Sequence, residues 1–318
     1  MVSEKKVTVI ALGGNAILQP GQKGIFAEQM ENVVTTCKQL VQMVKSGEYK
    51  IVITHGNGPQ VGNILLQNEH SREVAAPMPL YVCGAQSQGL IGYMMQQALR
   101  NLLAEEGKGD IPVATVVTQT VVDRDDKAFQ NPTKPVGPFY SEEEAQKLEK
   151  EKGYHLREDA GRGWRRVVPS PDPVEIFEKE AIRQLIDART IVIASGGGGI
   201  PVVKEGASLV GVDAVIDKDL AGERLAVDVE AKIFLILTDV DQVKLDYRTP
   251  QEKSLSKMTL AEAKAYRDEG QFAEGSMEPK VRAAIRFVEA GGERAVITSL
   301  DKAMDALEGR AGTSITGS

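Results

Sequence analysis

Four β-rich apolar runs in this sequence are each followed, after at most one intervening residue, by a cluster that contains glycine or aspartate. The runs cover residues 7–12, 51–54, 190–194 and 233–237, and the clusters are Gly13-Gly14, Gly56-Asn57-Gly58, Gly196 to Gly199 and Thr238-Asp239. Helically spaced apolar residues separate the runs, and strands that alternate with amphipathic helices indicate a mainly parallel sheet. Ligands of such sheets bind beyond the carboxyl ends of the strands. The pattern therefore predicts an enzyme or ligand binder of the α/β class.

Periodicity and turn residues predict the remaining elements. Pro59 suits the first turn of a helix, and Asp172-Pro173 is expected to open another helix, with Glu175 placed for a capping box. Helices are expected over about 30–44 (ended by Gly47), 85–104, 172–188, 214–229, 260–268 and 279–290, and further strands over 113–122 and 294–298.

Residues 122–170, which we name the lid, interrupt this alternation. Between residues 141 and 166, 14 of 26 side chains are charged, and a proline-rich stretch around Lys134 precedes them. Ser141 and Glu144 are placed to cap a short helix. A solvated surface insertion and a protruding subdomain that closes over the site both fit this pattern.

Charge and composition exclude several classes of protein. The net charge of −7 and an aromatic content of 5% argue against a nucleic-acid coat. Cys37 and Cys83 form neither a metal-binding pair nor a disulfide framework, and the three histidines share no zinc-ligand spacing. No stretch approaches 18 apolar residues, so no membrane span is predicted. We expect a cytoplasmic protein with no nucleic-acid or membrane partner.

Lysines near the glycine clusters suggest a site for phosphate. The chain has no Walker A motif, and Gly56-Asn57-Gly58 followed by Gly62 misses the dinucleotide spacing by one residue. Backbone N–H groups at glycine turns and helix starts can hold an anion instead. Lys280 lies in a first helical turn, where a cation opposes the helix dipole, and Lys218 lies between two aspartates. An exposed charge cluster explains these two lysines as well as a bound dianion does.

Taken together, seven segments resemble carbamate kinases of the amino-acid kinase family. They are Ala11 to Ala16, Gly56 to Gly62, Pro132 to Tyr140, Gly196 to Pro201, Ala214 to Asp219, Leu237 to Val240 and Phe272 to Val281, in order over nearly the whole chain. Two positions depart from the family's pattern, because proline is usual in place of Glu274 and a small or apolar residue in place of Glu278.

The resemblance implies an open αβα sandwich with a mainly parallel sheet and a small protruding subdomain. It also implies phosphoryl transfer between ATP and carbamate, giving ADP and carbamoyl phosphate, with Mg²⁺ and in a homodimer. Family members in arginine fermentation use the direction that makes ATP. Residues 1–212, the lid included, are expected to bind carbamate and the phosphoryl group, and residues 213–318 to bind the nucleotide.

The resemblance also assigns residues to roles. The expected catalytic residues are Lys134, Lys218, Lys280 and Asp219, and the expected substrate-binding residues are Gly13, Gly14, Asn15, Asn57 and Gly58. The expected nucleotide-binding residues are Gly197, Gly198, Asp217, Asp239, Val240, Tyr247, Ala273, Ser276 and Met277. We name no protein ligand for Mg²⁺, because this ion is usually held through phosphates and water.

Two alternatives stay open at this point. One is another kinase of the same family that phosphorylates an amino-acid carboxylate, although such a substrate needs a counter-charge for its α-carboxylate or amine. The other is a non-catalytic sensor of nucleotides or amino acids with the same fold. The presence of all three lysines and Asp219 favours an enzyme over a sensor.

Overall fold

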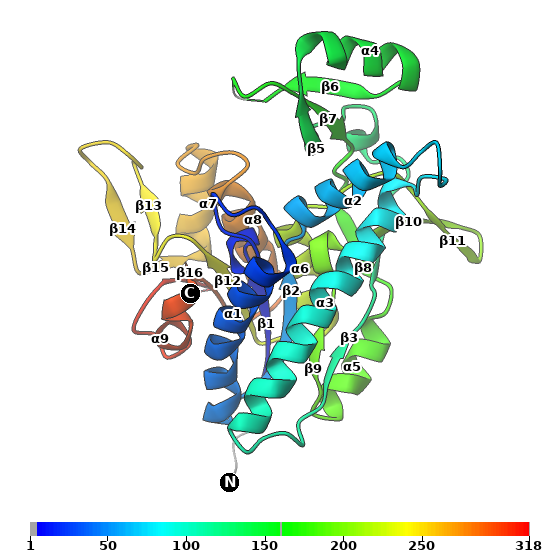
Figure 1. The fold of residues 1–318 in the computed structure, drawn as a ribbon. Helices are drawn as coiled ribbons and strands as arrows, with labels where there is room; N and C mark the ends of the chain where they lie inside the picture. The colour runs from blue at the N-terminus through cyan, green and yellow to red at the C-terminus, as the bar shows by residue number, and fades with distance from the viewer. Residues whose placement is uncertain (1–4, 160, 318) are drawn as a thin grey trace.

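An eight-stranded sheet runs through the centre of the molecule in this computed structural model, which describes residues 5–159 and 161–317 (Figure 1). Its strand order is β15-β17-β16-β12-β1-β2-β9-β3, and every neighbouring pair is parallel except β16 with β17. The strands are β1 (Lys6–Leu12), β2 (Tyr49–His55), β3 (Val113–Thr115), β9 (Ile191–Ile193), β12 (Ile233–Thr238), β15 (Lys257–Thr259), β16 (Arg294–Ser299) and β17 (Thr313–Thr316).

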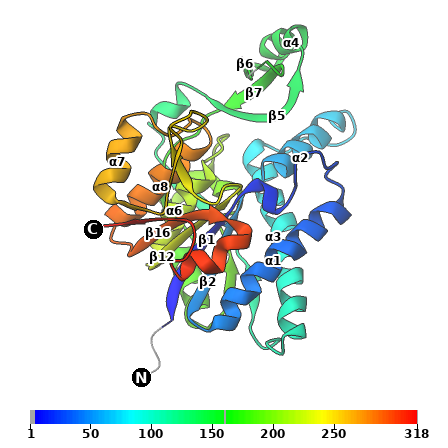
Figure 2. The ribbon, with the colours of Figure 1, turned by 90° about the vertical axis from the view of Figure 1, so that its left-hand side faces the viewer.

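Helices cover both faces of this sheet (Figures 1 and 2). In β1, Val9 and Ala11 join one buried apolar cluster while Ile10 and Leu12 join another, as expected for a strand that is buried on both sides. The first cluster includes α5 (Lys179–Asp187), α6 (Lys218–Asp228), α7 (Leu260–Asp268) and α8 (Met277–Glu289); the second includes α1 (Phe26–Ser46), α3 (Leu80–Glu105) and α9 (Ala303–Leu307). The predicted αβα sandwich is confirmed.

The helix boundaries follow local sequence signals. Gly47 ends α1 in the left-handed conformation, and Pro59 lies in the first turn of α2 (Gly58–His70), as predicted.

No membrane-spanning helix is found within the described residues. None of the helices there is both long enough and apolar enough to cross a membrane.

Three predicted elements are wrong in part. Residues 113–122 do not form one strand: β3 ends at Thr115, and β4 (Gln119–Val122) belongs to a second sheet, of order β11-β10-β4-β8. The backbone can leave the central sheet here because the buried Gln88 side chain bonds both the N–H and the C=O of Thr118. The other strands of this sheet are β8 (Pro173–Ile176), β10 (Ile200–Glu205) and β11 (Ser208–Gly211).

The expected helix from Asp172 does not form at its predicted start. Pro173 begins the edge strand β8, a position that needs no N–H donor, and α5 starts only at Lys179. Glu175 binds Lys179 and Lys204 instead of closing a capping box. The helix expected over 214–229 also starts later, at Lys218.

The lid contains its own small sheet and stands away from the sandwich above α2 (Figures 1 and 2). Its strands are β5 (Lys134–Tyr140), β6 (His155–Glu158) and β7 (Trp164–Val168), in the order β5-β7-β6, and α4 (Glu142–Lys152) begins with the predicted Ser141–Glu144 capping box. A further hairpin, β13 (Val243–Leu245) with β14 (Lys253–Leu255), follows β12.

Candidate active site

The glycine clusters meet at one edge of the central sheet, because the strands that precede them are parallel neighbours. The N–H of Gly13, after β1, donates to Leu237 O at the end of β12, 3.0 Å away. A Cβ atom on Gly56, after β2, would lie 3.3 Å from Lys218 Cδ and 3.6 Å from Gly14 Cα. The Lys218 side chain therefore lies directly against Gly56, and Gly14 lies beside the same residue.

Three lysines from different elements converge on two aspartates at this edge. Lys218 Nζ lies 2.8 Å from Asp219 Oδ1, and Lys280 Nζ lies 3.2 Å from Asp219 Oδ2. Lys134 Nζ, from the start of β5, lies 2.8 Å from Asp217 Oδ2. The cluster joins the lid, α6 and α8, and its three ammonium groups exceed its two carboxylates by one positive charge.

The start of α6 holds the two carboxylates in place. Asp217 caps the helix: its Oδ1 accepts the N–H of Asp219 at 2.9 Å, which leaves Oδ2 for Lys134. Burial raises the pKa of Asp217, but Lys134 and the helix N–H outweigh burial, and the pKa ends below its ordinary value. The Asp219 side chain is only 4% exposed, so its position is fixed by packing as well as by charge.

Asn57 and the four-glycine segment form the neighbouring part of the edge. Asn57 Nδ2 donates to Ser87 Oγ at 2.7 Å. Gly197 lies against the Asn57 amide, and Gly198 against Ile216 O. The resemblance assigned both glycines to the nucleotide, and the structure places Gly197 beside Asn57 and Gly198 beside Ile216. Gly58 is the first residue of α2.

A cavity of about 620 Å³ opens beside Lys280, between the end of β12 and the start of α8. It brings together most residues expected to bind the nucleotide: Asp239, Val240, Tyr247, Ala273, Ser276 and Met277. Lys244, Arg248 and Gln271 also line it, and the sequence reasoning missed them. The first two come from the β13–β14 hairpin region, for which no strand was predicted.

Two further cavities open at the carboxyl ends of the strands or beside the lid. One of about 900 Å³ lies between the lid and α8, and Lys134, Asp217, Glu274 and Glu278 are among its lining residues. The other, of about 260 Å³, is lined by Gly13, Asn15 and Asp239 at the ends of β1 and β12. The 900 Å³ cavity reaches Lys134 and the 620 Å³ cavity reaches Lys280, so ligands can approach these two ammonium groups from different cavities.

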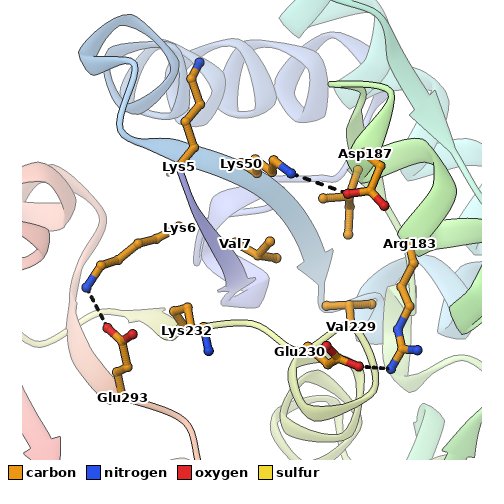
Figure 3. Close-up of a pocket in the computed structure, with 11 residues that line it drawn as sticks. Lys5, Lys6, Val7, Lys50, Arg183, Asp187, Val229, Glu230, Lys232 and Glu293 are labelled. Carbon is orange, nitrogen blue, oxygen red and sulfur yellow. Dashed lines mark hydrogen bonds and ion pairs between the residues drawn. The ribbon is translucent and has the colours of Figure 1, made fainter. Parts of the chain in front are cut away.

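A separate cavity of about 410 Å³ lies at the opposite edge, at the amino ends of β1 and β12 (Figure 3). Three basic side chains that line this cavity form ion pairs: Lys6 with Glu293, Lys50 with Asp187 and Arg183 with Glu230. None of the site residues predicted from the sequence lines this cavity. Because ligands of parallel sheets bind at the carboxyl ends of the strands, the lysine cluster is the candidate active site.

His55, the last residue of β2, is fully buried beneath this edge. Its Nδ1–H donates to Gly56 O at 3.0 Å, and burial lowers the pKa of the imidazole to about 4, despite the opposing effect of that hydrogen bond. The unfolded chain takes up this proton near pH 6.5 and the native chain only near pH 4. His55 thus contributes stability above pH 6.5 that is lost as the pH falls towards 4.

We expect His55→Asn to reduce the pH dependence of stability. The wild-type free energy of unfolding should fall between pH 7 and pH 4.5 more steeply than that of the variant, by up to about 3 kcal/mol. Urea unfolding at both pH values measures the difference. Equal slopes for the two proteins would show that His55 carries no such linkage.

Comparisons with known proteins agree with the geometry of the site. The model of the amino acid kinase family matches residues 6–299. The chain is 60% identical to the carbamate kinase of Thermococcus kodakarensis over 98% of this chain and 99% of that one, and 57% identical to that of Pyrococcus horikoshii over 97% and 98%. A structure of carbamate kinase from Giardia lamblia bound to AMP-PNP matches with a TM-score of 0.93, 51% identity and 98% coverage of both chains. The chain belongs to the amino acid kinase family and, within it, to the carbamate kinases.

Proposed function

We propose that the chain catalyses reversible phosphoryl transfer, ATP + carbamate ⇌ ADP + carbamoyl phosphate. In the forward direction a carbamate oxygen forms a bond to the γ-phosphorus as the bond from that phosphorus to the β–γ bridging oxygen breaks. The observation that carries the proposal is the convergence of Lys134, Lys218 and Lys280 beside two glycine turns. Three positive charges fit a transferring group whose negative charge is spread over three equatorial oxygens.

The protein has two chemical tasks, which are to position the two substrates and to stabilise the negative charge of the transferring phosphoryl group. Carbamate already carries an anionic oxygen, so the attack needs no general base. We propose that Lys218 and Lys280 stabilise the transferring phosphoryl group and that Asp219 orients both ammonium groups. Lys134, which belongs to the lid, would supply the third positive charge next to the phosphoryl group. Such fixed charges act without reorganising during the reaction.

The two substrates are proposed to approach from different parts of the edge. Gly13, Gly14, Asn15, Asn57 and Gly58, all within residues 1–212, would hold carbamate and phosphoryl oxygens, with Gly197 and Gly198 shaping that side. The nucleotide would occupy the 620 Å³ cavity, which residues 213–318 line. The relation to the Giardia lamblia enzyme bound to AMP-PNP supports a nucleotide site in this chain.

Mg²⁺ is proposed to arrive with the nucleotide. The described residues contain no group of three or more His, Cys, Asp or Glu side chains placed to hold a metal ion, and Asp217 and Asp219 are paired with lysines. This donor set fits an ion held by phosphate oxygens and water. When bound, Mg²⁺ would neutralise charge on the nucleotide phosphates.

A panel of acceptors tests the proposed substrate. With ATP and Mg²⁺, the purified protein should release ADP with carbamate, formed from bicarbonate and ammonia, but not with acetate, L-aspartate or L-glutamate. Preference for an amino acid would favour the related amino-acid kinases. Nucleotide binding without turnover on any acceptor would favour the sensor.

We also propose a homodimer. Exposed large apolar side chains lie on α3 (Leu90 and Tyr93) and on or next to the outer strands of the four-stranded sheet (Val174, Phe177 and Val210). α3 packs against β10 of that sheet, whose two outer strands are β8 and β11. Because exposed apolar surface is typical of a region that another protein covers, α3 and this sheet are the surface proposed to contact the second copy.

Glu278 is expected to weaken nucleotide binding. It lines the 900 Å³ cavity together with Lys134 and lies two residues before Lys280, so its charge opposes an incoming phosphate. Glu278→Gln should lower the KM for ADP by no more than about tenfold, which corresponds to 1.4 kcal/mol or less for a partly exposed charge. Steady-state kinetics measures the change. An unchanged or higher KM would mean that Glu278 only offsets Lys280.

The lid is proposed to move when substrates bind. In this structure it is anchored to the end of α2, where Glu69 pairs with Lys152 and accepts a hydrogen bond from Tyr154 at 3.1 Å. Hydrogen exchange should show protection of residues 122–170 when ADP and carbamoyl phosphate are added. Equal exchange in both states, together with a fully active Lys134→Ala variant, would contradict the proposal.

A further inference from the structure

A line of charged side chains connects the base of the lid with α8. Asp172 follows the last lid strand, β7, and precedes β8. Its two carboxylate oxygens accept hydrogen bonds from Arg282 Nη2 at 3.0 and 3.1 Å, and Oδ1 also accepts one from Arg286 Nη1 at 3.0 Å. Both arginines lie on α8, the helix that carries Lys280.

Arg286 continues this line to α6. Its Nε lies 3.0 Å from Glu223 Oε2, and the Glu223 side chain is 3% exposed. Among the described residues that oxygen accepts no hydrogen bond of good geometry, so the contact is mainly one of charge. Burial raises the pKa of Glu223, while Arg286 and Arg224 act to lower it. A buried carboxylate of this kind depends on its cationic partners.

Two ion pairs therefore join α6 to α8. Asp219 with Lys280 lies at the substrate end, and Glu223 with Arg286 lies further along both helices. Glu223 is one turn beyond Asp219, and Arg286 is about 9 Å beyond Lys280 along its helix at 1.5 Å per residue. Apolar packing is not directional, so it does not fix how far α8 is shifted along α6. A buried ion pair does fix this position, because its two charged groups are in contact at only one relative shift of the helices.

We propose that Asp172, Arg286 and Glu223 are positioning residues for phosphoryl transfer. Arg286 holds α8 in register with α6, so that Lys280 stays on Asp219. Asp172 ties this register to the base of the lid, from which Lys134 comes. None of the three belongs to the lysine cluster, and each acts through it. The inference rests on the proposed function, because its effect is seen in the rate of that reaction.

The double variant Glu223→Gln/Arg286→Met tests the inference, because it removes both charges and leaves neither one buried alone. We expect kcat for ATP formation to fall by about tenfold or more, since a displacement near 1 Å at a catalytic group is costly. The KM for ADP should change by less than about threefold, because the cavity residues are untouched. Arg286→Lys keeps the positive charge but lacks the guanidinium group, whose separate nitrogens contact Asp172 and Glu223. Its kcat should therefore lie between that of the wild type and that of the double variant.

Glu289→Gln is the matched control. Glu289 also forms an ion pair on α8, with the exposed Lys264 of α7, and no ion pair joins it to α6 within the described residues. Its kcat should equal that of the wild type. A merely structural role would lower the stability of the double variant and leave kcat per folded molecule within about twofold of wild type; that result overturns the inference.

Asp172→Asn provides a second variant if the double variant does not fold, because the Asp172 side chain is 48% exposed. Its kcat should fall by about fivefold and be restored by Asp172→Glu, which keeps the carboxylate. An unchanged kcat in Asp172→Asn would overturn the inference. Absence of turnover in the wild-type protein is a different outcome, because it would refute the proposed function itself.

Discussion

Lys218→Ala is expected to lower kcat for ATP formation by about 10²–10³-fold, the usual loss for one preorganised group that stabilises a transition state. Lys218 Nζ is held by Asp219 at 2.8 Å, and its side chain lies against Gly56 in the glycine turn after β2. Its charge is therefore fixed before the phosphoryl group arrives. The KM for ADP should change little, because Lys218 does not line the 620 Å³ cavity.

Lys264→Ala is the control for the loss of a lysine. Lys264 forms an exposed ion pair with Glu289, away from the cluster, so kcat should stay at the wild-type value. Steady-state kinetics of both variants, with circular dichroism to verify folding, separates the two effects. A Lys218→Ala enzyme with near-normal kcat would remove Lys218 from the proposed mechanism.

Gly197→Ala should reduce activity by about 10²-fold, because it displaces a group proposed to hold the substrate. A Cβ atom at this position would lie 2.1 Å from Asn57 Nδ2, far inside contact distance. The residue also has φ +65°, a left-handed conformation that alanine adopts only with strain. The variant therefore combines a steric clash with backbone strain.

Gly206→Ala separates these two causes. Gly206, between β10 and β11, has φ +60°, but nothing lies within 4 Å of its Cβ position. Its alanine variant carries similar backbone strain without the clash, so it should be somewhat less stable and fully active. Equal kcat in Gly197→Ala and Gly206→Ala would mean that the contact between Gly197 and Asn57 has no part in catalysis.

The central sheet and its ligand edge could be predicted because short-range signals determine them. Runs such as residues 7–12 are apolar at every position but Thr8, as expected for strands covered on both faces, and glycine follows this run directly. The strand order then places the ends of β1, β2, β9 and β12 side by side. The Ser141–Glu144 capping box and the stop at Gly47 are equally local signals.

The missed features depend on contacts between distant parts of the chain. Asp172 resembles a helix cap in sequence, but Arg282 and Arg286, more than a hundred residues later, occupy its carboxylate. Residues 113–122 read as one strand because the side chain that allows the break, Gln88, comes from α3. No local pattern encodes either contact.

The arrangement of the site was predicted only in part. The sequence places Lys218 between two aspartates, and the structure shows that one of them, Asp219, holds both Lys218 and Lys280. That Lys134 pairs with Asp217 follows from how the lid sits on the sandwich, which periodicity does not reveal. Lys244 and Arg248 were missed because β13 and β14 have only three residues each, too few for a period to be recognised.

Formation of ATP by the purified protein from ADP, Mg²⁺ and carbamoyl phosphate is the most direct test of the proposed reaction. A coupled assay that consumes ATP should show continuous turnover with the wild-type chain and almost none with Lys218→Ala. Acetyl phosphate, which lacks the carbamate nitrogen, serves as the substrate control and should react much more slowly. Absence of ATP formation from carbamoyl phosphate by the folded wild-type protein would contradict the assignment of this site to phosphoryl transfer between ADP and carbamate.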